Sequence, residues 1–269
     1  MAKKLLVAIV MVMLFTGPAL AERIVCASTT STENSGLFDY ILPMFKNKTG
    51  IDVHVVAVGT GAALEMAKRG DADVVFVHAK GLELEGVKEG YFVNRHDVMY
   101  NDFVIVGPKN SAGKFKGTKK AADVLTAISK DSLAFVSRGD NSGTHRKELS
   151  LWKNAGIDPK GGKWYLEVGQ GMSKTLRIAN EKQAFSMTDR GTWLALKDRD
   201  LLEMEVAFEG DPVLFNQYGA MAVNPDKYPH VRFNEAMSFV HWLTSKEGQE
   251  AIGSFKDAKG NNLFIPNAN

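Results

Sequence analysis

Short β-rich runs alternate with stretches of helical periodicity from residue 22 to residue 106, and this alternation constrains the fold more than any other feature. Residues 23–27, 52–58 and 74–77 have the composition of strands, with many Val residues. Between these runs, apolar residues recur at the spacing of one helix face. We therefore predict an α/β fold in which a mainly parallel sheet is flanked by helices.

Polar corners rich in Ser, Thr and Gly follow the first two of these strands. Residues 28–32 read Ser-Thr-Thr-Ser-Thr, and residues 59–63 read Gly-Thr-Gly-Ala-Ala. Such junctions lie at the carboxyl ends of the strands, where open α/β sheets bind their ligands. Ordinary turns are also rich in these residues, so one corner alone would be read as a turn.

A third corner, residues 136–145, lies between a strand-like run and a helical run. Amides at the helix N-terminus and the hydroxyls of Ser142 and Thr144 can donate to an anion, and Gly143 allows close approach. Arg138 adds a permanent positive charge with paired donors. An ordinary N-cap beside a surface arginine is the alternative interpretation. The recurrence of three similar corners favours anion binding.

The chain is punctuated where it leaves the first strand–helix alternation and where it returns to it. A strand-like run over residues 97–106 breaks at Gly107-Pro108, and a later break falls at Asp211-Pro212. The residues between these breaks have strands and helices of their own, and residues 213–223 read as a strand that returns to the first unit. We predict two lobes with a ligand in the cleft and two hinge strands between them. Lobe 1 comprises residues 22–106 and 213–269, and lobe 2 comprises residues 107–212.

The N-terminus has the pattern of a secretory leader. Lys3 and Lys4 precede an apolar run, and small residues end it at Ala21. We expect a signal peptide over residues 1–21, so that the mature protein is exported. The single cysteine, Cys26, cannot form an intramolecular disulfide and is not placed as in a lipoprotein.

The charges of the chain nearly balance. Thirty-three Lys and Arg against 31 Asp and Glu give a net charge of +2, and two of the lysines are in the leader. This balance argues against binding of nucleic acid or of a membrane surface. An anion would have to be held by a local site.

Four stretches of the sequence resemble the tungstate-binding proteins, a family of type II periplasmic solute-binding proteins of ABC transporters. They are residues 27–37, residues 73–79, the corner at residues 137–145, and Asn216-Gln217-Tyr218-Gly219 with Asn224-Pro225. The resemblance covers nearly all of the mature chain. Ser28 stands where the family has threonine, which keeps the hydroxyl group.

The resemblance implies a two-lobed clamshell in the periplasm that binds tungstate, with molybdate as a second candidate ligand, and that needs no cofactor. It also implies a membrane permease with a cytoplasmic ATPase as partners and a monomeric binding protein. The ligand-binding residues that it implies are Ser28, Thr29, Thr30, Thr60, Gly61, Arg138, Ser142, Gly143 and Thr144.

Phosphate is the alternative ligand, because phosphate-binding proteins of this class also resemble the Arg-x-Asp-x-Ser-Gly-Thr stretch. Hydrogen phosphate carries a proton and needs an acceptor, whereas unprotonated tungstate would be repelled by a carboxylate. Asp140 could be this acceptor or could only orient Arg138. Phosphate binders usually have a second aspartate after the third strand, where this chain reads Phe76-Val77-His78-Ala79. This difference favours the unprotonated dianion.

A hydrolase is the alternative from another class, because Asp140, Ser142 and His145 are close in sequence. There is no Gly-x-Ser-x-Gly motif, and neighbouring residues at a helix start cannot face one another as a catalytic triad requires. The six histidines show no spacing typical of a metal site. We therefore predict a binding protein that is not an enzyme and holds no bare metal cation.

Overall fold

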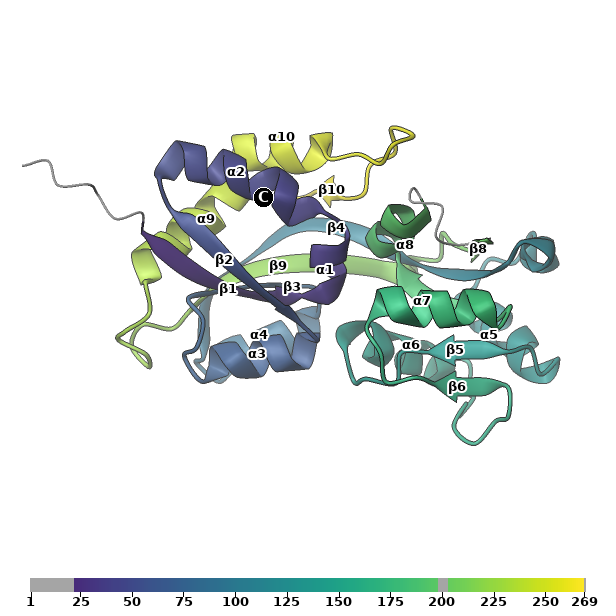
Figure 1. Ribbon diagram of the computed structural model, residues 1–269. Helices are drawn as coiled ribbons and strands as arrows, with labels where there is room; N and C mark the ends of the chain where they lie inside the picture. Colours follow the sequence, from purple (N-terminus) through teal and green to yellow (C-terminus); the bar gives the residue numbers. More distant parts are fainter. Residues whose placement is uncertain (1–21, 198–202, 269) are drawn as a thin grey trace, which may run out of the picture.

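The computed structural model describes residues 22–197 and 203–268, and Figure 1 shows how their elements are arranged. The expected signal peptide, residues 1–21, lies outside the described residues. The strands are β1 (Arg23–Thr29), β2 (Asp52–Val58), β3 (Val74–Val77), β4 (Phe92–Pro108), β5 (Phe135–Ser137), β6 (Tyr165–Glu167), β7 (Ser186–Asp189), β8 (Met204–Phe208), β9 (Phe215–Val223) and β10 (Ile265–Pro266). The α-helices are α1 (Thr30–Asn34), α2 (Leu37–Thr49), α3 (Thr60–Lys68), α4 (Lys80–Lys88), α5 (Ala121–Lys130), α6 (Gly143–Asn154), α7 (Met172–Glu181), α8 (Arg190–Lys197), α9 (Phe233–Thr244) and α10 (Lys246–Ser254). The 3-10 helices are η1 (Lys109–Phe115) and η2 (Pro212–Leu214).

The first lobe is built on a sheet with the strand order β2-β1-β3-β9-β4-β10. β1 is parallel to β2 and β3, whereas β9 runs antiparallel to both β3 and β4. Helices α2, α9 and α10 cover one face of this sheet, and α3 and α4 cover the other (Figure 1). The predicted α/β fold is therefore confirmed, with a mixed sheet whose strands β1, β2 and β3 are parallel.

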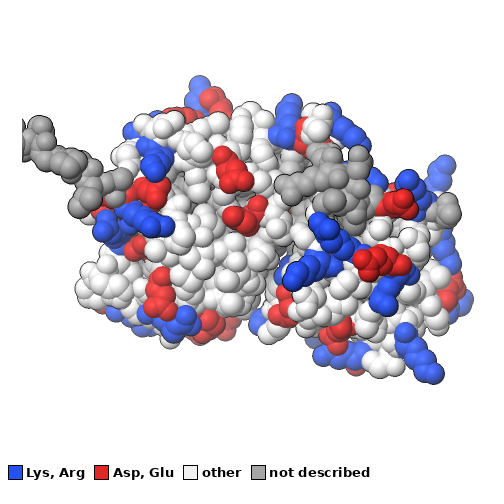
Figure 2. Space-filling view, viewed as in Figure 1, with Lys and Arg blue, Asp and Glu red and all other residues white. Residues whose placement is uncertain are grey.

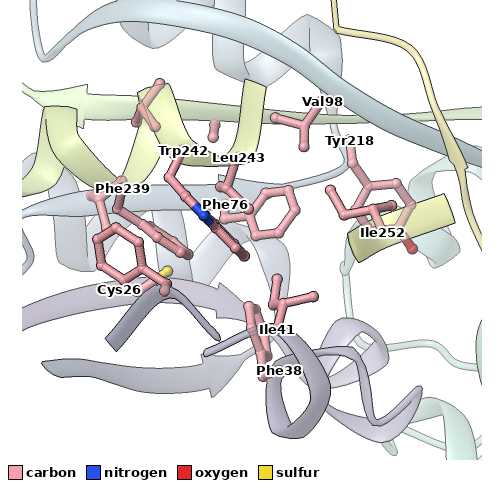
Figure 3. Packing of buried hydrophobic residues seen from close by; sticks show 14 of the residues in the cluster. Cys26, Phe38, Ile41, Phe76, Val98, Tyr218, Phe239, Trp242, Leu243 and Ile252 are labelled. Atoms are coloured by element: carbon pink, nitrogen blue, oxygen red, sulfur yellow. The ribbon is translucent and has the colours of Figure 1, made fainter. Parts of the chain in front are cut away.

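Side chains of the first lobe alternate between two cores, as the pleat of a strand requires. Cys26 and Phe76 lie in the core under α2, α9 and α10, whereas Ala27 and Val75 lie in the core against α3. Figure 3 shows the first of these cores, where residues of α2 and α9 surround Phe76. The buried Cys26 thiol is free, and its burial raises its pKa well above the usual range.

β4 runs through both lobes. Its residues 92–102 pair with β9, and its residues 103–108 pair with β7 or β8. Beyond Asp102 its side chains enter the cores of the second lobe: Phe103 packs in the core of α5 and α6, and Val104 in the core of α7 and α8. The sheet of the second lobe continues through an isolated bridge between Phe185, the residue before β7, and Phe135 of β5, and β6 is parallel to β5.

The predicted break at Gly107-Pro108 does not interrupt β4, which begins at Phe92 and includes both residues. A side chain at Gly107 would lie 2.5 Å from the ring of Phe185, so this glycine makes room for a neighbouring ring and does not form a turn. The lobe boundaries at residues 106/107 and 212/213 stay a prediction.

The strands predicted over residues 23–27, 52–58, 74–77, 97–106 and 213–223 are found, although β4 already begins at Phe92, but α1, α4 and β10 were not predicted. α4 contains two glycines and an exposed Leu84, so it lacks a strong amphipathic pattern. β10 has two residues. Within residues 22–197 and 203–268, no helix is long and apolar enough to span a membrane.

A buried ion pair joins α4 to the middle of the first sheet. Arg95 Nε donates to Glu83 Oε2 at 2.8 Å, and the amide of Ala79 donates to Glu83 Oε1 at 2.7 Å. Burial raises the pKa of Glu83 to about 7, although the positive charge of Arg95 acts in the opposite direction. A side chain at Gly219 of β9 would lie 2.4 Å from Glu83 Oε2. Gly219 is therefore required by close packing.

Candidate functional site

The carboxyl ends of three strands of the first lobe meet at one edge of the sheet. Thr29 is the last residue of β1 and lies beside Val58, the last residue of β2. Thr60 starts α3 directly after β2, and His78 directly follows β3. Two of the three predicted corners are therefore neighbours, as the parallel strand order requires.

The third corner, from the second lobe, meets this edge. The amide of Gly143, the first residue of α6, donates to Thr60 Oγ1 at 3.3 Å. On the other side, Thr192 Oγ1 of α8 donates to the carbonyl of Ser31 at 3.4 Å. We call the buried polar region between these two contacts the interlobe site.

Hydroxyl groups of the first corner form a network that ends at His78. Thr29 caps α1, because its Oγ1 accepts from the amide of Thr32 at 3.3 Å. Ser31 Oγ lies 2.9 Å from His78 Nε2, and His78 Nδ1 lies 3.0 Å from Asn216 Oδ1. An amide oxygen only accepts, so Nδ1 carries the hydrogen and Nε2 accepts from Ser31. Burial lowers the pKa of His78, which keeps the ring neutral.

Arg138 brings the positive charge of the third corner. Its side chain is 4% exposed, and Asp140 Oδ2 accepts from its Nε at 3.1 Å and from its Nη2 at 2.5 Å. The other carboxylate oxygen, Asp140 Oδ1, accepts from the amide of Ser142 at 3.1 Å. Burial acts to raise the pKa of Asp140, but the hydrogen bonds from Ser142 and the charge of Arg138 outweigh it, so this pKa is lowered. Asp140 is thus an ionised residue that orients Arg138.

The N-terminus of α6 leaves one buried hydroxyl group without a partner. Ser142 is the N-cap of this helix, and its Oγ accepts from the amide of His145 at 3.3 Å. Thr144, two residues later, is buried, and among the described residues its Oγ1 has no hydrogen-bond partner. A buried hydroxyl without a partner is costly, so this atom is suited to contact a ligand.

Asp189 is a buried carboxylate that the sequence analysis did not single out. It ends β7, and its Oδ2 accepts from the amide of Thr192 at 2.8 Å, while Oδ1 has no partner among the described residues. Burial raises its pKa, whereas the hydrogen bonds from Thr192 and the charge of Arg138 act in the opposite direction. The signal was present in the polar Thr-Asp-Arg-Gly-Thr run at residues 188–192, which the sequence analysis did not consider.

The predicted site residues lie mostly in buried positions. Ser28, Thr29, Thr60, Arg138, Ser142 and Thr144 are buried, and Thr30, Gly61 and Gly143 are partly buried. The hydroxyl of Ser28 differs from the expectation, because it donates to the carbonyl of Phe76 at 2.6 Å within the sheet. The amides of Ser142 and Gly143, which we expected to be free, donate to Asp140 and Thr60.

Glu148 is linked to the third corner by hydrogen bonds through Ser137. Its carboxyl group accepts from Ser137 Oγ at 2.7 Å, from Trp152 Nε1 at 3.0 Å and from the Tyr165 hydroxyl at 2.7 Å. Ser137 Oγ in turn accepts from the amide of Gly139, next to Arg138. Despite these hydrogen bonds, burial raises the pKa of Glu148 from its usual value of 4.5 to about 7.

The pKa of Glu148 leads to a prediction for stability. Between about pH 4.5 and 7, Glu148 keeps a proton in the native protein that it has released in the unfolded chain. The stability that this difference gives to the native state is therefore lost as pH rises. Relative to a Glu148→Gln variant, the wild-type free energy of unfolding should fall by about 2–3 kcal/mol from pH 5 to pH 8. Urea unfolding of both proteins at several pH values measures this difference. A difference that does not change with pH would contradict the prediction.

His, Cys, Asp and Glu side chains in the described part of the chain form no group of three or more that could hold a metal ion.

Comparisons with known proteins give the following similarities. The family profile described as PBP superfamily domain matches residues 16–247. The tungstate-binding protein TupA of Peptoclostridium acidaminophilum is 47% identical over 248 residues, which are 91% of this chain and 86% of that protein. The crystal structure of the tungstate ABC transporter from Geobacter sulfurreducens has a TM-score of 0.80 and 50% identity, covering 87% of this chain and 99% of that one. The tungstate-binding protein TupA from Desulfovibrio alaskensis G20 has a TM-score of 0.79 and 44% identity, covering 93% of this chain and 100% of that one.

Proposed function

This chain belongs to the PBP superfamily and, within it, to the tungstate-binding proteins of ABC transporters, and from this premise we propose that it captures tungstate in the interlobe site. The contact between Thr60 and Gly143 carries the proposal, because it joins corners from the two lobes and the second of these corners contains the buried Arg138. Relatives that are 44–50% identical and named for tungstate support it.

The chemistry of the interlobe site suits a tetrahedral dianion. An anion that leaves water for a dry cleft needs roughly two hydrogen-bond donors for each oxygen. Hydroxyl groups, main-chain amides and one cation, Arg138, can supply them without a free carboxylate in the same corner. The unpartnered hydroxyl of Thr144 would gain a partner from the ligand.

We propose that the ligand-binding residues are those implied by the family resemblance. Ser28 belongs to this set through the resemblance alone, because its hydroxyl hydrogen is donated to Phe76. The full set is Ser28, Thr29, Thr30, Thr60, Gly61, Arg138, Ser142, Gly143 and Thr144.

Phosphate and hydrolysis are less well supported. Relatives that match most of this chain are named for tungstate and not for phosphate. For hydrolysis, His145 would have to activate Ser142. Its Nδ1 instead accepts from the amide of Asn141 at 3.0 Å. We therefore propose that the protein carries an oxyanion and is not an enzyme.

The proposal places the protein in a transport system. A signal peptide over residues 1–21 would direct it to the periplasm, where it would work as a monomer. The closed, loaded form would deliver the oxyanion to a membrane permease driven by a cytoplasmic ATPase. Molybdate has the same shape and charge as tungstate, so the same site would accept it.

Titration with four oxyanions tests the proposal. The melting temperature of the purified protein should rise with tungstate and with molybdate, because a ligand that binds only the folded state adds RT ln(1 + [L]/Kd) to its stability. Sulfate and phosphate, added at the same concentrations, serve as the comparison. A rise with phosphate alone would overturn the tungstate assignment in favour of a phosphate-binding protein.

A further inference from the structure

Two clefts open beside the contact between Thr60 and Gly143, and they differ in charge. The α3–α6 cleft has both signs in its wall, with Glu65, Glu85 and Asp140 opposite Lys68 and Arg146. The α4–α6 cleft, of about 540 Å³, has Lys80, Arg146 and Lys147 in its wall, and no Asp or Glu is among the described residues that line it. An anion is therefore attracted more strongly by the second cleft.

The α4–α6 cleft reaches the interlobe site. Its wall includes His78 and Asn216, which are joined by a hydrogen bond of 3.0 Å, and Gly143, whose amide contacts Thr60. These three residues belong to the interlobe site or border it directly. An ion in this cleft is thus next to the site.

Lys147 is the cation of this cleft that is best placed to attract an anion. It follows Gly143 by four residues on α6, so both lie on one face of the helix about 6 Å apart along its axis. Lys80 is bonded to Asp97 at 3.0 Å, and Arg146 Nε donates to the carbonyl of Asn141. The ammonium group of Lys147 has no such partner among the residues that the structure describes. It is partly buried, and burial lowers its pKa, with Asp211 acting in the opposite direction.

Apart from Asp211, which acts on Lys147 itself, the charges elsewhere on the surface are mixed in sign. Figure 2 shows Lys and Arg mixed with Asp and Glu over both halves of the face in view, and the whole chain has a net charge of +2. Beyond a Debye length of about 8–10 Å, such mixed surface charges are screened. The rise of about 6 Å along the axis of α6 from Gly143 to Lys147 is shorter than this length.

We propose that the α4–α6 cleft is an encounter site for the oxyanion, where Lys147 attracts the dianion before the lobes close on it. This inference rests on the proposed function, since it concerns the path to the same site. Lys147 acts on the rate of association, because it lies at the mouth of the site and not among the ligand-binding residues. The bound state keeps its own contacts, so the rate of dissociation is unaffected.

Stopped-flow tryptophan fluorescence with tungstate tests the encounter site. At low ionic strength, Lys147→Gln should lower the association rate constant by about threefold and Lys147→Glu by about tenfold, with the dissociation rate constant unchanged. At high ionic strength the difference from wild type should disappear. Lys153→Gln, which removes the same charge from an exposed position of the same helix, should keep the wild-type rate.

The outcomes separate this inference from the proposed function. A wild-type association rate in Lys147→Gln, an equal loss in Lys153→Gln, or a change confined to dissociation would overturn the encounter site alone. A wild-type protein that gives no response to tungstate would overturn the proposed function, and the encounter site with it.

Discussion

Replacing Arg138 by alanine should weaken tungstate binding by roughly 30-fold to several thousand-fold, which corresponds to about 2–5 kcal/mol for a charge-assisted pair in a dry site. The side chain is 4% exposed and is held in place by Asp140, so little reorganisation precedes binding. The substitution removes the positive charge of the corner and leaves Asp140 without its partner. Isothermal titration calorimetry with tungstate measures the loss.

Two variants sharpen this test. Arg138→Lys keeps the charge but not the planar pair of donors, so it should recover only part of the affinity. Arg177→Ala, on an exposed position of α7, should bind as the wild type does. If Arg138→Ala bound tungstate with unchanged affinity, the assignment of the interlobe site would be wrong.

Replacing Gly219 by alanine should lower the free energy of unfolding by about 3 kcal/mol. The new methyl group would lie 2.4 Å from Glu83 Oε2 and 2.7 Å from Arg95 Nη2, and these two side chains are only 0% and 8% exposed. Overpacking costs about 1–3 kcal/mol, and a disturbed buried ion pair costs more. Urea unfolding monitored by circular dichroism measures the change.

Gly81→Ala is the matched control for Gly219→Ala. Gly81 lies in α4, beside the same ion pair, but a side chain there would meet no atom within 4 Å. Alanine is the better helix former, so this variant should be as stable as the wild type or slightly more stable. Equal unfolding free energies of the two variants would show that the space beside Glu83 is not limiting.

The sequence was informative about the three corners because their positions follow from local rules. Parallel strands end at a common edge, so Thr29 and Thr60 had to be neighbours once their strands were recognised. The N-cap that was the alternative interpretation of the third corner is also present, at Ser142. Arg138 and Asp140 lie two residues apart, so their pairing was also within reach of a local argument.

Other features of the site depend on contacts between distant segments, which local patterns do not report. Asp189 is buried because α8 packs against α1, and Glu148 because Tyr165 and Trp152 close over it. Ser28 was expected to donate to a ligand, but a carbonyl of the neighbouring strand takes its hydrogen. The sequence around Lys147 is that of an ordinary surface lysine. Only its position in the wall of the α4–α6 cleft distinguishes it.

The single strand β4 also links the hydrophobic cores of the two lobes into one thermodynamic unit. Its apolar residues before Asp102 are buried in the cores of the first lobe and those after it in the cores of the second lobe, so unfolding of either lobe removes hydrogen-bond partners from the same strand. A fragment limited to the second lobe would expose a row of unsatisfied amides and carbonyls that favours aggregation. The domain should therefore denature as a whole, in one cooperative transition.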